Sequence, residues 1–88
     1  MDIRQKTVRA LETFLSELEV DGVCGFFVDP DHDGQVKVVV ILDIDFIQDS
    51  NTKPEFVARM FRMGVKNEIQ KWLGIDVYVG STAKKCNE

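Results

Sequence analysis

The sequence has few of the residues from which disulfide frameworks and metal clusters are built. It contains two cysteines, two prolines and one histidine in 88 residues. A single histidine excludes any cluster that requires two, and two distant cysteines do not make a disulfide framework. We therefore expect a small core residue at Cys24, a thiol in the tail at Cys86, and a reducing, cytoplasmic location.

Long apolar runs are also missing. The longest spans 38–42 and is closed by Asp43, whereas a helix that crosses a bilayer needs about 20 apolar residues. The first residues mix charges with apolar side chains and lack the apolar region of a secretory signal. We expect no membrane span and no membrane partner.

The residues that are present have the composition of one small globular domain. Apolar residues make up 44% and charged residues 30% of the chain, with a net charge of −4. These values lie near the averages of globular proteins. We expect a single α+β domain over 1–80 and a flexible C-terminal tail over 81–88.

Apolar periodicity and turn residues predict five elements. The expected elements, in chain order, are a helix over 3–19, strands over 23–28 and 36–47, a helix from the Thr52–Glu55 capping box to Gly74, and a strand over 75–79. The acidic turn over 29–34 joins the first two strands as a hairpin. A helical crossover between the last two strands favours a parallel pair. The predicted fold is a two-layer αββαβ sandwich, with a mixed three-stranded sheet and both helices on one face.

Alternation along the second strand divides its side chains between two faces. The predicted core face carries Val36, Val38, Val40, Leu42, Ile44 and Phe46. In the long helix the predicted core residues are Val57 or Ala58, Phe61, Val65, Ile69 and Trp72. A second apolar line on this helix, Phe56, Met60 and Met63, fits either an adaptable binding groove or the core, and the core is favoured.

The opposite face of the sheet is expected to be an interface. Val39 and Ile41 point to it, and the neighbouring strands add Tyr78 and one of Phe26 or Phe27. Apolar side chains grouped on three strands form a patch of a size typical of interaction sites. This predicts a homodimer that uses Val39, Ile41 and Tyr78, or the edge strand. The alternative is that the tail or the long turn covers the patch.

The acidic turn is a candidate metal site. Asp29, Asp31, Asp33 and Gly34 match the opening of a calcium loop. The ninth and twelfth positions of such a loop are Lys37 and Val40, so the bidentate glutamate is missing. The alternative is a hairpin turn without metal.

A second pair of carboxylates, Asp43 and Asp45, ends the predicted central strand. A period of two places both on one face, where they could hold Mg²⁺ and a phosphate. The string LDIDF resembles the acidic strand of nucleotidyltransferases, which implies phosphoryl transfer. The glycine–serine turn and helix that precede that strand in the family are not found here. The alternative role of the two aspartates is to keep the strand end soluble.

Basic side chains on the long helix are a candidate nucleic-acid surface. Arg59, Arg62 and Lys66 share one face by their spacing. The element order is similar to that of type II KH domains, and this resemblance implies RNA binding. A net charge of −4 opposes long-range attraction to nucleic acid.

No nucleophile stands beside a base, so we expect no catalytic residues. The favoured prediction is a small cytoplasmic protein-interaction module that self-associates, without a bound cofactor. A Ca²⁺ or Mg²⁺ site is the alternative, and RNA or ribosome binding is the third.

Overall fold

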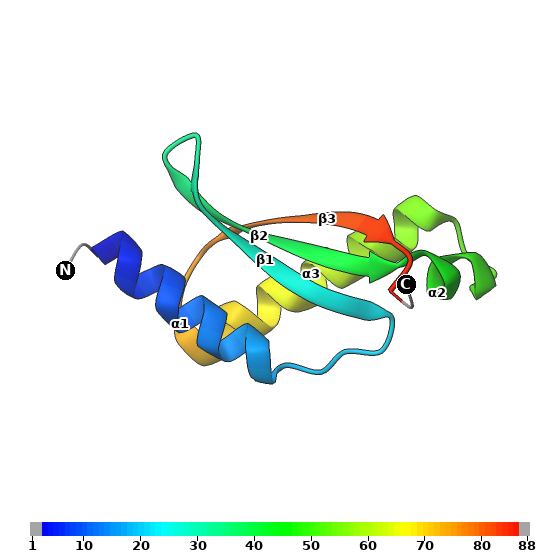
Figure 1. Cartoon of the computed structure of the whole chain (residues 1–88), viewed down its shortest axis with the longest axis horizontal. Helices are drawn as coiled ribbons and strands as arrows, with labels where there is room; N and C mark the ends of the chain where they lie inside the picture. The colour runs from blue at the N-terminus through cyan, green and yellow to red at the C-terminus, as the bar shows by residue number, and fades with distance from the viewer. Residues whose placement is uncertain (1–2, 87–88) are drawn as a thin grey trace.

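The computed structural model describes residues 3–86. Its elements are α1 (Ile3–Glu17), β1 (Val23–His32), β2 (Gln35–Asp43), α2 (Ile44–Asp49), α3 (Pro54–Leu73) and β3 (Tyr78–Lys84). The molecule measures 44 × 25 × 24 Å, with α1 at one end and α2 at the other (Figure 1). The predicted α+β class is confirmed.

The three strands form one mixed sheet in the order β1-β2-β3. β1 and β2 are antiparallel and β2 and β3 are parallel, as the sequence predicts. The hairpin turn consists of Asp33 and Gly34, whose φ angles are 52° and 83°. Two positive φ angles define a type I′ turn, the turn whose twist matches that of paired strands. The acidic segment therefore belongs largely to β1, with only two residues in the turn.

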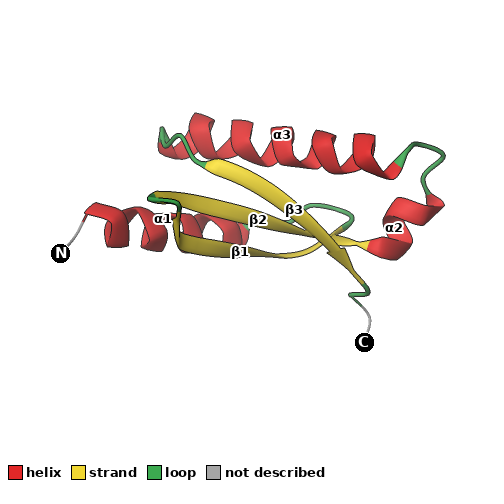
Figure 2. Ribbon diagram, turned by 90° about the horizontal axis from the view of Figure 1, so that it is seen from above, coloured by secondary structure: helices red, strands yellow, loops and turns green. Residues whose placement is uncertain are grey.

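The core lies against one face of β2. Val38, Val40 and Leu42 are fully buried, which confirms the predicted alternation up to Leu42. The helical and loop residues buried with them are Leu11, Leu15, Ile47, Val57, Val65, Ile69 and Val77. Figure 2 shows α3 along one side of the sheet, and α1 packs mainly against β1. The prediction that both helices lie on one face of the sheet, as a two-layer sandwich, stays a prediction.

The central strand is shorter than predicted. It ends at Asp43, and residues 44–49 form α2. The Asp43 carboxylate accepts a hydrogen bond of 3.1 Å from the backbone N–H of Asp45, which caps the helix. Because the period changes at the cap, Ile47 is buried and Phe46 is 42% exposed, so the predicted core position of Phe46 is wrong.

Helix α3 has the predicted end but not the predicted capping box. Pro54 is in the first turn and Gly74 ends the helix with a φ of 65°, yet the N-cap is Lys53, without a side-chain cap hydrogen bond. Trp72, predicted in the core, is 64% exposed. Its indole N–H donates to Glu68 at 2.9 Å, which satisfies the ring at the surface. Phe56, Met60 and Met63 are exposed as well, so their assignment to the core is wrong.

The C-terminal segment is ordered further than predicted. β3 covers Tyr78–Lys84, not 75–79, and pairs with β2 from Lys37 to Asp43. The backbone hydrogen bonds of a buried central strand explain why polar residues 81–84 are in a strand and not in a tail. Residues 87–88 lie outside the described residues.

The two cysteines form a disulfide, contrary to the expectation of separate thiols. Cys24 and Cys86 have Cα atoms 5.5 Å apart, the usual separation for a disulfide, and 62 residues apart in sequence. The extension of β3 along β2 brings Cys86 back to the start of β1. Paired cysteines give no reason to expect a reducing compartment.

We predict that the double substitution Cys24→Ser and Cys86→Ser lowers the free energy of unfolding by about 4 kcal/mol. The disulfide closes a loop of 62 residues in the unfolded chain, and its removal gives the unfolded chain more conformational entropy. Urea denaturation measures the difference. Addition of a reductant to the unmodified protein should reproduce it and leave the double variant unchanged. An unfolding midpoint that does not respond to the reductant would contradict this.

Two glycines, one just before β1 and one within it, provide a matched test of the backbone at the start of this strand. Gly22 has a φ of 87°, and a Cβ there would lie 2.6 Å from the Phe46 ring; a Cβ at Gly25 has nothing within 4 Å. We expect Gly22→Ala to cost about 1–3 kcal/mol of stability, through a strained φ and displacement of Phe46. Gly25→Ala should stay within about 1 kcal/mol in the same denaturation experiment. Equal costs would contradict this.

Candidate functional site

The face of the sheet away from the core has an apolar centre. Strand register pairs Phe27 with Val39 on β1 and β2, and pairs Val39 with Gly80 on β3. The next row joins Ile41 to Gly25 and Thr82. Phe27 is 57% exposed, and Val39 and Ile41 are half-buried. We call this surface the open face, defined by Phe27, Val39, Ile41 and Tyr78.

Charged and polar groups border the open face at both ends. At one end Lys37 lies between Asp29 and Tyr78 in the register. The Lys37 ammonium lies 5.3 Å from the centre of the Tyr78 ring. The His32 ring stacks on the same Tyr78 ring, with the two ring centres 6.0 Å apart. At the other end Asp43 pairs with Lys84. An apolar centre within a charged border is the composition of a protein interface.

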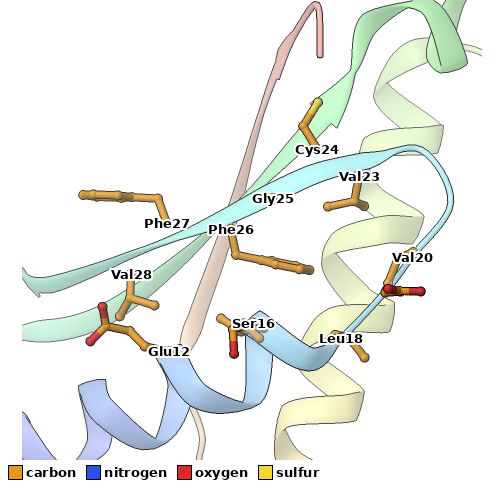
Figure 3. A pocket seen from close by; sticks show the side chains of 12 residues that line it. Glu12, Ser16, Leu18, Val20, Val23, Cys24, Gly25, Phe26, Phe27 and Val28 are labelled. Atoms are coloured by element: carbon orange, nitrogen blue, oxygen red, sulfur yellow. The ribbon is translucent and has the colours of Figure 1, made fainter. Parts of the chain in front are cut away.

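The predicted interface residues lie together on this face. Val39 and Ile41 are adjacent on β2, and Tyr78 begins β3 beside them, 56% exposed. Of the two phenylalanines that the sequence left open, Phe27 joins them, since Phe26 packs against the core. Figure 3 shows Phe27 and Cys24 pointing to the side of β1 opposite to Phe26 and Val28.

The carboxylates of the acidic turn are engaged in the hairpin itself. Asp29 accepts from the backbone N–H of Asp31 at 3.1 Å, and Asp31 accepts from that of Gly34 at 3.0 Å. Arg4 of α1 lies 3.6 Å from Asp31 and donates to the Gly34 carbonyl. Among residues 3–86 no three acidic, histidine or cysteine side chains lie close enough to hold a metal ion. A calcium site with Asp29, Asp31 and Asp33 stays a prediction, and the positions of the described side chains do not support it.

Asp43 and Asp45 are not the strand pair that the sequence predicts. Asp43 is the N-cap of α2 and Asp45 is in its first turn. A period of two no longer relates their side chains, because the backbone turns into a helix between them. The geometric reason to place Mg²⁺ and a phosphate on this pair is therefore lost.

The basic side chains of α3 have different surroundings. Arg62 donates to the Ser81 hydroxyl at 2.8 Å and so links α3 to β3. Lys66 lies 3.7 Å from Asp76, and Arg59 is exposed. Because Arg62 and Lys66 already contact groups of their own chain, the three residues do not present a uniform surface for phosphates.

Among the hollows in the described part of the chain are two that were not predicted. One, of about 540 Å³, runs between β1, α1 and the segment that joins them (Figure 3). The other, of about 500 Å³, lies between α2, α3 and the segment after α1, and is lined mainly by apolar side chains, Met60 and Phe61 among them. The exposed aromatics and methionines of α3 were the only sequence signal for the second hollow, and they favoured the core instead.

Comparison of the chain with protein-family models, curated proteins and solved structures finds no match. In the described part of the chain, no helix is both long and apolar enough to cross a membrane. The geometry of the open face and of the hollows is therefore the basis for any functional conclusion.

The contact between Arg62 and Ser81 provides a test of how α3 is attached to the sheet. We expect Arg62→Ala to lower the free energy of unfolding by about 1–2 kcal/mol, because a half-buried hydrogen bond from a charged donor is lost. Arg59→Ala, one turn earlier and exposed, should change it by less than about 0.5 kcal/mol. Thermal denaturation of both variants measures this, and equal stabilities would contradict the proposed attachment.

Proposed function

We propose that this protein is a non-catalytic interaction module that forms a homodimer through the open face. The observation that carries the proposal is the row Phe27–Val39 with Ile41 beside it, on a sheet whose other face is packed. In this apolar centre Phe27 is exposed, and Val39 and Ile41 are half-buried. Monomeric proteins rarely leave contiguous apolar surface of more than a few hundred Å² in water.

The shape of the face supports a second copy of this chain as the occupant. Phe27 projects from β1, while Gly25, two residues away on the same face, leaves its surroundings open. A two-fold axis brings identical patches together, so the ring of one copy can pack over the glycine of the other. The border carries Asp29 and Asp43 as well as Lys37 and Lys84, so contact between like charges is not forced.

The size of the surface indicates how the contact is built. A stable interface buries roughly 800 Å² on each partner, more than a patch of a few hundred Å². The charged border must therefore take part, and the dimer is expected to weaken as salt rises. The disulfide between Cys24 and Cys86 lies at the border near Lys84 and fixes that end of the face.

The chain offers two exposed phenylalanines for a matched experiment. Phe27 lies on the open face and is 57% exposed; Phe56 lies on α3 and is 55% exposed. We expect Phe27→Asp to convert the dimer to a monomer at micromolar concentration and Phe56→Asp to leave the dimer intact. Sedimentation velocity measures the mass, and circular dichroism checks the fold of both variants.

Val39→Asp, at the centre of the face, is the second variant and should also give a folded monomer. A dimer mass retained by both open-face variants would refute the proposal, as would an unmodified protein that stays monomeric at millimolar concentration. Loss of the dimer in Phe56→Asp alone would move the interface to α3.

A further inference from the structure

The free edge of β1 is a second surface on which this fold can bind another chain. The sheet order β1-β2-β3 gives β1 a partner on one side only. Its register with β2 is regular from Gly25 to Asp29. In an antiparallel pair alternate residues direct their N–H and C=O groups away from the partner. Part of the β1 backbone is therefore directed outward, at the edge where an added strand would pair.

The hollow of about 540 Å³ lies along this edge. It is lined by β1 from Val23 to Val28, by α1 residues including Glu12 and Ser16, and by the connecting segment with Glu19. Six residues of strand span about 17–20 Å, which sets the length of an added segment at five or six residues. In Figure 3 the side chains of Phe26 and Val28 point from β1 toward α1.

Charge indicates the kind of chain that fits. Glu12 and Glu19 are exposed in the lining, and none of the described residues that line the hollow is basic. We propose that this edge binds an extended, basic segment of a partner protein as a fourth strand, with its backbone on β1 and its lysine or arginine side chains toward Glu12 and Glu19. A second copy of β1 fits less well, because it would bring its own Glu12 and Glu19 to the same place.

The probe is a short peptide of alternating valine and lysine, acetylated and amidated at its ends. Isothermal titration calorimetry gives its affinity, and amide hydrogen exchange followed by NMR locates it. We expect protection of alternate amides between Gly25 and Val28. A peptide with glutamate in place of lysine, and one methylated on its backbone nitrogens, should both bind at least tenfold more weakly.

Charge-reversed variants test the assignment of the two glutamates. The double variant Glu12→Lys and Glu19→Lys should weaken binding about tenfold, since each exposed ion pair contributes a few-fold in affinity. The double variant Glu17→Lys and Glu55→Lys is the control with the same change in net charge: both residues are exposed, and neither lines the hollow. Its affinity should stay within twofold of the unmodified protein.

Three results would overturn the proposal. The first is protection outside β1, for example along the α2–α3 hollow. The second is an equal loss of affinity in the two double variants, which would indicate attraction to net charge alone. The third is protection of the same amides without peptide that increases with protein concentration, because that would assign the edge to a second copy of β1.

Discussion

Burial of one face of β2 is the constraint on which the rest of the structure depends. Val38, Val40 and Leu42 are almost completely inaccessible to water, and each apolar side chain buried to this degree stabilises the fold by roughly 1.5–3 kcal/mol. Such burial requires cover from α1 and α3 and strand partners on both sides of β2. Because a strand alternates its side chains, the same burial directs Val39 and Ile41 to the opposite face, so the core itself determines the open face.

Burial of one face of β2 also explains how much of the fold could be predicted from the sequence. Alternation and the turn residues were enough to predict the hairpin, the central strand, the parallel crossover and the long helix ending at Gly74. The predicted interface residues Val39, Ile41 and Tyr78 lie on one face, as expected, for the same reason. Features that depend on single contacts were not predicted. The Asp43 carboxylate caps α2 and so ends the strand, and Phe46 is exposed as a result.

Long-range contacts account for the remaining errors. Residues 81–84 have the composition of a tail, yet they form a strand because the edge of β2 supplies backbone partners. That pairing carries Cys86 to Cys24, across 62 residues of sequence, and no local pattern indicates the meeting. A helical apolar stripe also includes Trp72 and the line of Phe56, Met60 and Met63. These side chains are exposed because only one face of α3 is covered, and a three-stranded sheet is too narrow to cover a second apolar face of the helix.

The disulfide links the two surfaces that β1 carries. One side of β1 presents Phe27 to the open face, and its free edge borders the hollow with Glu12 and Glu19. Both surfaces require β1 to stay paired with β2, and the strand register is irregular between Val23 and Gly25, where Cys24 lies. A covalent link at this irregular point opposes fraying of the strand from its N-terminal end, where backbone pairing is weakest. The same bond holds the segment after β3 beside the open face, so the environment that forms or reduces it acts on both proposed binding surfaces at once.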